Sequence, residues 1–230
     1  MTIRYHPEVI QGSEEWHAIR CGLITASEMK YVITPTLKVA DNEKTRTHVW
    51  ELAAQRISRY VEPTYIGDDM VRGWEDEIKA RAMYTQVTGH AVEETGVITN
   101  DRWGFTIGYS PDGVVTGENG GIECKSRRQK YQVQTVVEWH RNKTIPTDYV
   151  IQVQTGLLVS EWDWIDLVSY SGGLRMPIMR VFPDPVIHDA IVNATGEFEK
   201  NVRAAVSDYE IGSVGMVDTE RSVEEEMYVE

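Results

Sequence analysis

Residues 110–126 read SPDGVVTGENGGIECKS, and they decide the fold because two turn sequences alternate with two strand sequences. Pro-Asp-Gly at 111–113 is typical of a tight turn, and GENGG at 117–121 is typical of a second one. The segments VVT and IECKS have the composition of short strands. We therefore predict two consecutive strands, the first beginning at Asp112 and the second folding back beside it.

This hairpin is predicted to bring charged side chains to one place. Side chains alternate between the faces of a strand, so Glu123 and Lys125 point one way and Cys124 the other. Asp112 then converges with Glu123. Two carboxylates suit Mg²⁺, and the Cys124 carbonyl can supply a further oxygen. A lysine beside the metal can position or deprotonate an attacking water.

Each part of this pattern has a simpler interpretation when it is taken alone. A Pro-Asp-Gly sequence is usually just a turn, and a Glu-x-Lys strand is usually an exposed charged edge. The ordered combination on consecutive strands is more specific than either part. We therefore take Asp112, Glu123 and Lys125 as the leading candidates for a catalytic unit.

Helices surround the hairpin in the sequence. Apolar residues recur at helical spacing before residue 90, and strand composition replaces that pattern across 96–126. This order predicts an α/β protein with a mixed central sheet flanked by helices. We expect one domain, 1–211, and an acidic, flexible tail, 212–230. The expected helices are 14–20 capped by Ser13, one starting at Thr25 or Ser27, one starting at Asn42, one from about Asp69 to Gly89, 129–141, one from Thr147 and one from Asp184; strands are also expected at 96–100, 103–110, 164–170 and 175–182.

Charge is distributed unevenly along the chain. The net charge is −13, yet residues 125–143 hold six bases and one acid, while the last 13 residues hold six acids and one base. Such runs are most often solvated faces, although a basic run can also line a track for an anionic polymer. No apolar run is long enough to span a membrane, and no secretion signal is expected. Two cysteines without a CxxC pair favour a reducing, cytoplasmic setting.

Four motifs together resemble one nuclease family. The chain is similar, from about Trp16 to Tyr209, to the YqaJ-like viral recombinases and lambda-type phage exonucleases of the PD-(D/E)xK superfamily, which have a restriction-endonuclease-like fold. The motifs are Trp16-His17 with Arg20-x-Gly22-Leu23-Ile24-Thr25-Ala26-Ser27-Glu28, then Gly73-x-x-x-Glu77-x-x-Ala80-Arg81, the hairpin motif, and Tyr149-x-x-Gln152-Val153-Gln154.

The resemblance implies roles for particular residues. Asp112, Glu123 and the Cys124 carbonyl would hold two Mg²⁺ ions, which Mn²⁺ could replace, and Glu77 would complete the site partly through water. Lys125 would act on the nucleophilic water, and Gln152 would orient that water or a phosphate. Without the resemblance, Glu77 and Gln152 would be interpreted as ordinary surface residues of helices.

A second site is implied around Arg20, Thr25 and Ser27. Hydroxyls and free backbone N–H groups at a helix start, next to an arginine, can bind an anion. In the family this segment receives the 5′-phosphate of the degraded strand, and Met70 is a candidate wedge that separates the strands. The simpler interpretation makes Thr25 or Ser27 a helix cap, Arg20 a surface charge and Met70 a staple to the core.

The function implied is a Mg²⁺-dependent 5′-to-3′ exodeoxyribonuclease. It would degrade one strand of linear duplex DNA from 5′-phosphorylated ends and expose 3′ single strands for phage-type recombination. A homotrimeric ring, a single-strand annealing protein as partner, and the cytoplasm of a bacterial host complete this expectation. Two alternatives stay open: a site-specific or nicking endonuclease of the same superfamily, and a non-catalytic DNA-binding or partner-recruiting subunit. A four-cysteine iron–sulfur cluster is excluded by the cysteine count.

Overall fold

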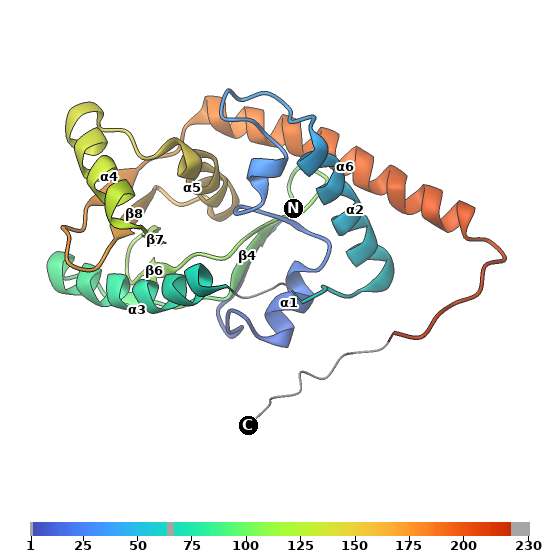
Figure 1. Ribbon diagram of the computed structural model, residues 1–230, viewed down its shortest axis with the longest axis horizontal. Coiled ribbons are helices and arrows are strands. Elements are labelled where there is room, and N and C mark those ends of the chain that lie inside the picture. Colours follow the sequence, from blue (N-terminus) through green and yellow to red (C-terminus); the bar gives the residue numbers. More distant parts are fainter. Residues whose placement is uncertain (1, 64–66, 222–230) are drawn as a thin grey trace.

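The structure is a computed structural model that describes residues 2–63 and 67–221 (Figure 1). Its helices and strands come partly in runs, with five strands in succession across residues 92–126. In order they are β1 (Ile3–His6), α1 (Glu14–Arg20), β2 (Ile24–Thr25), the 3₁₀ turn η1 (Met29–Tyr31), α2 (Glu43–Ser58), α3 (Asp68–Thr88), β3 (Val92–Glu93), β4 (Val97–Asn100), β5 (Ile107–Tyr109), β6 (Gly113–Val115), β7 (Gly120–Ser126), α4 (Gln129–Asn142), α5 (Thr147–Ser160), β8 (Trp164–Tyr170), β9 (Ile178–Val181) and α6 (Pro185–Gly212).

The described strands form two mixed sheets. One has the order β3-β6-β7-β8-β9 and the other has the order β1-β4-β5-β2. In the first sheet β7 and β8 are parallel, and in the second β2 and β5 are parallel. The α/β class is confirmed, but the strands are divided between two sheets rather than joined in one. The division falls between β5 and β6, where Pro111 has no N–H to donate to a ladder.

The helices cover these sheets from different sides (Figure 1). Ala80 and Tyr84 of α3 pack on Ile122 of β7 and Val168 of β8 in a small apolar cluster. A larger cluster contains α5 together with parts of α2, α6 and the β4-β5 sheet. The hairpin of β6 and β7 therefore lies between two packed helical layers, and its backbone is held on both faces.

The starts of α1, α2 and α6 follow from local capping chemistry. Ser13 accepts a hydrogen bond from the Trp16 N–H at 3.2 Å, and Asn42 accepts one from the Thr45 N–H at 3.2 Å. Asp184 caps α6 in the same way. Such caps satisfy backbone donors that the helix itself leaves unpaired. The helices expected to begin after Ser13, Asn42 and Asp184 are confirmed.

The helix expected to start at Thr25 or Ser27 is wrong. Thr25 instead ends β2, which pairs in parallel with β5 and sets Thr25 opposite Gly108. Only the 3₁₀ turn η1 follows it. The strands β1 and β3 were not expected either. These short strands depend on partners distant in sequence, which local periodicity does not reveal.

The C-terminal region is described as far as Arg221. Helix α6 ends at Gly212, close to the expected domain limit at 211, and Figure 1 shows its last turns extending beyond the rest of the fold. Residues 222–230 lie outside the described residues, so the flexible tail stays a prediction. Within the described part of the chain, no helix has the length and apolar character needed to cross a membrane.

Candidate active site

The hairpin of β6 and β7 places an aspartate beside a glutamate. Gly113 pairs with Ile122, so Asp112, one residue before β6, lies beside Glu123 and Cys124. The backbone N–H of Cys124 donates a hydrogen bond of 2.6 Å to Asp112 Oδ2. Arg81 of α3 also donates to the backbone carbonyl of Asp112, at 3.1 Å. The turn is thereby tied to both its partner strand and the covering helix.

Alternation along β7 sorts its side chains as the sequence predicts. Glu123 and Lys125 face α5, where they meet Gln152 and the ring of Tyr149. The Cys124 side chain joins the apolar cluster under α3. The N–H and C=O of one strand residue point to the same neighbouring strand. Because the Cys124 N–H points to Asp112, its carbonyl also faces the Asp112 side.

Glu123 is buried and held by three donors. Its side chain is 3% exposed. Lys125 Nζ lies 2.8 Å and Gln152 Nε2 lies 2.6 Å from Oε1, while the Tyr109 hydroxyl donates to Oε2 at 3.0 Å. The interpretation of Gln152 as an ordinary surface residue of a helix is therefore wrong, because its amide contacts Glu123. The three contacts also fix the orientation of the Glu123 carboxylate before any ligand binds.

Negative charge accumulates at this place. Burial raises the pKa of Asp112 well above its usual range, and the carboxylates of Glu123 and Glu77 raise it further. Burial also raises the pKa of Glu77, partly offset by Arg81. For Lys125, burial alone lowers the pKa, but Glu123 and Asp112 outweigh it and raise the pKa above its usual value. The site is therefore short of positive charge, and its lysine is held in the charged form.

These residues fit a magnesium ion. Asp112 Oδ1 accepts no hydrogen bond from any described residue, and the Cys124 carbonyl faces the same side. Among residues 2–63 and 67–221, no group of three or more His, Cys, Asp or Glu side chains encloses a metal position. Mg²⁺ usually needs only one or two carboxylates, because it retains waters and takes substrate phosphate oxygens. A bound Mg²⁺ ion would also balance the excess negative charge of the site.

Glu77 adjoins this site from helix α3. Its side chain is a quarter exposed, and Oε1 lies 3.4 Å from Arg81 Nη1. The same guanidinium contacts Glu94 at 2.7 Å. Arg81 thus links Glu77 to the Asp112 turn. Interpreting Glu77 as a freely solvated helix residue is wrong, although no described contact joins it directly to Asp112 or Glu123.

A second cluster collects around Arg20. Its guanidinium donates to Thr25 Oγ1 and to Ser110 Oγ, both at 3.3 Å, and stacks 3.9 Å from the centre of the Trp16 ring. Thr25 Oγ1 lies 3.3 Å from Ser27 Oγ. Trp16 donates its own indole N–H to Ser110 at 3.0 Å. The structure therefore brings together Arg20, Thr25 and Ser27, and it adds Ser110.

This cluster is built from side chains and not from a helix start. No α-helix begins at Thr25, so the expected contribution from free helical N–H groups is wrong; Glu28 accepts the Thr25 N–H. Arg20 has no ion pair with any described acid, and its polar partners are neutral hydroxyls. Burial lowers its pKa. The Glu28 carboxylate, which accepts from the Thr25 hydroxyl, partly offsets this effect on the Arg20 pKa. A half-buried guanidinium whose own hydrogen-bond partners are neutral hydroxyls is suited to an anionic ligand.

The two clusters are joined along the chain and across a cavity. Tyr109, Ser110 and Asp112 lie within four consecutive positions, and they contact Glu123, Arg20 and Cys124 respectively. A cavity of about 170 Å³ also lies between Ser27 and Gln152. Its remaining lining residues are Ala26, Lys30, Asp148, Tyr149 and Ile151. An anion held by Arg20 would therefore lie next to the acidic site.

The structure adds residues that the sequence did not single out. Tyr109 and Ser110 reach the two clusters only because β5 pairs with β2 and ends beside the hairpin. From the basic segment 125–143, Arg127 donates to the Tyr149 hydroxyl at 2.9 Å, whereas Arg128 pairs with Asp69 on α3. The serine before Pro-Asp was the available signal for Ser110. The basic segment thus divides between the site and the surface.

Met70 lies in the first turn of α3 with 42% of its surface exposed. An exposed methionine is not a staple to the core, so that interpretation is wrong. Met70 lies two helical turns before Glu77 on the same helix.

Comparisons with known proteins identify a matching family and similar solved structures. The sequence profile described as the YqaJ-like viral recombinase domain matches residues 15–163. No curated protein shows a significant sequence match. An alkaline exonuclease from Laribacter hongkongensis, LHK-Exo, shares 27% identity and a TM-score of 0.76, with 89% of this chain and 100% of the other covered.

Two further solved structures are similar. LHK-Exo in complex with dAMP gives 28% identity and a TM-score of 0.77 over the same shares of both chains. A phage-related exonuclease from Haemophilus somnus 129PT shares 16% identity and a TM-score of 0.58, covering 81% of this chain and 96% of the other. At that identity the last comparison shows the fold alone.

Proposed function

This chain belongs to the YqaJ-like viral recombinase family, and we propose that it is a Mg²⁺-dependent exonuclease that degrades the 5′-ended strand of linear duplex DNA. Two similar solved structures, at 27% and 28% sequence identity, are of an alkaline exonuclease. The direction of digestion, the metal and the residue roles are our proposal and rest on the site.

One observation carries the proposal: the anion pocket directly adjoins the acidic site. The segment from Tyr109 to Asp112 contacts Arg20 on one side and the carboxylates on the other. A terminal 5′-phosphate carries −1.5 to −2 charges. If Arg20, Thr25, Ser27 and Ser110 hold that phosphate, the next phosphodiester along the strand reaches Asp112 and Glu123. Terminal binding next to the cutting site favours removal of nucleotides from an end.

The chain's own residues divide the chemical work. Asp112, Glu123 and the Cys124 carbonyl would hold Mg²⁺, and Glu77 would assist through water. When bound, Mg²⁺ supplies a Lewis acid for the phosphoryl oxygens and the attacking and leaving oxygens. Lys125, charged beside Glu123, positions the nucleophilic water and offsets charge on the phosphate.

Gln152 has a positioning part in this scheme. Its amide donates to Glu123 Oε1 at 2.6 Å, and the side chain also lines the cavity toward Ser27. It can therefore hold the Glu123 carboxylate and meet a phosphate from the same place. Tyr109 holds the second oxygen of Glu123. Both residues keep the metal-binding carboxylate from rotating.

A comparison of linear and covalently closed circular duplexes tests the function. With Mg²⁺ the protein should release nucleotides from the linear DNA and leave the circle intact, and EDTA should stop digestion. Cutting of the circle would support the endonuclease alternative. Binding of DNA without any digestion in Mg²⁺ or Mn²⁺ would support the non-catalytic alternative.

The wider biology follows from the same proposal. Removing the 5′-ended strand leaves a 3′ single strand, which a single-strand annealing protein would coat for phage-type recombination in a bacterial cytoplasm. A homotrimeric ring around the DNA would give processivity, because release would then require the enzyme to run off an end. The acidic net charge and the local basic segment are compatible with a positive interior track.

A further inference from the structure

Helix α3 presents one stripe of side chains to the edge of the active site. Met70, Trp74, Glu77 and Arg81 follow at intervals of four, three and four residues, which places them on one face of a helix. Arg81 contacts Glu77 at 3.4 Å and the Asp112 carbonyl at 3.1 Å. The C-terminal half of the stripe is therefore part of the site, and its N-terminal half extends outward from it.

Trp74 is the large side chain of that outer half. It is 51% exposed, and it makes no hydrogen bond, ring contact or cation–π contact with any described residue. By contrast, Trp16 donates its N–H to Ser110, and Trp164 lies under the Arg180 guanidinium at 3.7 Å. The Trp74 ring thus has an open surface one helical turn from Glu77. Side chains three residues apart on a helix have Cβ atoms roughly 5–6 Å apart.

We infer that Trp74 is a stacking site for an unpaired nucleobase of the 5′-ended strand as it approaches the cutting site. The inference rests on the proposed function. Every nucleobase has a flat face, so stacking on an aromatic ring does not depend on the sequence. An enzyme that digests DNA from an end requires such sequence-independent contacts. Ile78, 63% exposed one turn farther on, widens the apolar surface beside the ring.

The order of residues on the stripe fixes which strand is involved. If Met70 separates the strands, the strand that continues to Glu77 passes Trp74 on its way. The 5′-phosphate pocket lies on the β5 side of Asp112, whereas α3 lies over the opposite end of the turn through Arg81. Trp74 therefore meets a base on the 3′ side of the scissile phosphate and leaves the terminal nucleotide to the other pocket.

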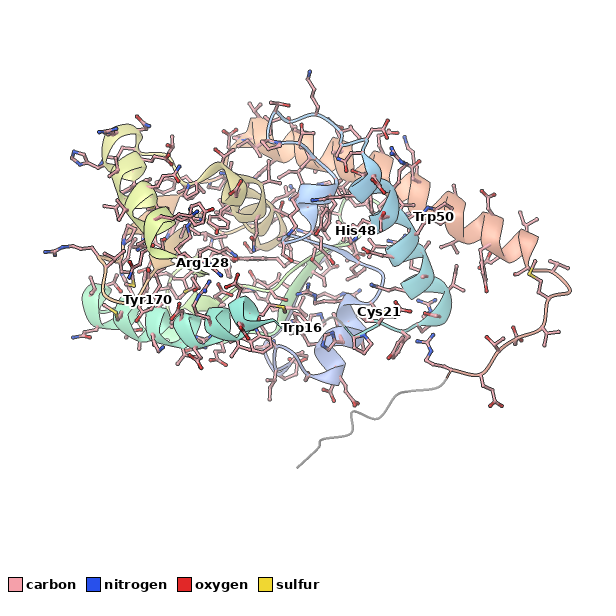
Figure 2. All side chains as sticks on the ribbon, in the orientation of Figure 1. Trp16, Cys21, His48, Trp50, Arg128 and Tyr170 are labelled. Atoms are coloured by element: carbon pink, nitrogen blue, oxygen red, sulfur yellow. The ribbon has the colours of Figure 1, made fainter. Side chains whose placement is uncertain are left out.

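Binding measurements with modified ends test the inference. The substrate is a 5′-phosphorylated duplex labelled at its far end, with no lesion or with one abasic residue at the second, third or fourth nucleotide of the 5′-ended strand. Affinity is measured in Ca²⁺ for the wild type, W74A, W74F and W50A. Trp50 is a matched control, because it is 64% exposed on α2 and also lacks described ring partners (Figure 2).

The expected result is a coupling between the ring and one base. W74A should weaken binding to the intact duplex by about 5- to 150-fold, W74F should recover part of the loss, and W50A should bind as the wild type does. One abasic position should lower wild-type affinity to the W74A level and leave W74A unaffected.

Three results would overturn it. Equal binding by W74A and wild type removes the site, and an equal loss on intact and abasic duplexes shows that Trp74 contacts no base. A reduced particle mass of W74A in light scattering makes Trp74 an interface residue. Failure of the wild type to digest linear duplex in Mg²⁺ would reject the proposed function instead, whatever the binding data show.

Discussion

Replacing Arg20 with alanine should remove most of the preference for a phosphorylated 5′ end. Arg20 is held between Thr25 and Ser110 at 3.3 Å and stacked on Trp16, so its donors are fixed before the ligand arrives. A hydrogen bond to a charged group contributes about 1.5–3 kcal/mol, which corresponds to about 10- to 150-fold in rate or affinity. A 5′-hydroxyl end is neutral and makes no charge-assisted hydrogen bond that the substitution could remove. R20A should therefore lower kcat/KM on phosphorylated ends by about that factor and leave hydroxyl ends nearly unchanged.

The assay compares initial digestion rates on two linear duplexes that differ only in the 5′ terminus. R20K should be intermediate at best, because an ammonium lacks the planar guanidinium that stacks on Trp16 and reaches two hydroxyls. R46A is the matched control: Arg46 is exposed on α2 and pairs with Asp41 at 3.0 Å. Equal wild-type rates on both ends, or an equal loss by R20A on both, would refute the pocket.

Three further predictions concern the acidic site and the assembly. Lys125→Ala should retain DNA binding in Ca²⁺ while turnover falls by about 10² or more, and near-normal turnover would reject its catalytic role. Asp112→Asn should unfold at a higher temperature than the wild type in EDTA. The pKa of Asp112 is raised in the folded state, so its ionised form destabilises the fold. This loss of stability is absent below the pKa of the unfolded state and complete above the pKa of the folded state. Mg²⁺ should raise the wild-type melting temperature but not that of Asp112→Asn, and an unchanged wild-type melting curve would count against metal binding at Asp112. Light scattering should give about three times the 26.2 kDa chain mass, and a salt jump after loading should slow digestion only modestly, whereas a monomer released at once by salt would remove the ring.

The parts of the fold that the sequence predicted depend on local chemistry. Ser13, Asn42 and Asp184 cap helices because their side chains satisfy backbone donors a few residues away. The convergence of Asp112 and Glu123 follows from one tight hairpin and from side-chain alternation. In each case the interacting groups lie within about a dozen residues, so pattern and turn chemistry are sufficient.

The parts that the sequence missed depend on distant partners. Thr25 is a residue type that often caps a helix start, but its pairing with Gly108 makes it the end of a strand. Tyr109 and Ser110 gain their roles in the two clusters from the same pairing. Tyr209, an aromatic residue near the end of α6, is 56% exposed because the last turns of that helix extend beyond the sheet layers (Figure 1). The local periodicity of a sequence does not show which distant element a residue will pack against.

A strand-resolved digestion tests the central claim most directly. The substrate is a linear duplex with a 5′-phosphate on one strand, a 5′-hydroxyl on the other, and a different internal label in each. The account predicts mononucleotides from the phosphorylated strand in Mg²⁺, while the complementary strand stays at full length. Shortening of the complementary strand from its 3′ end, or internal fragments from either strand, would contradict it.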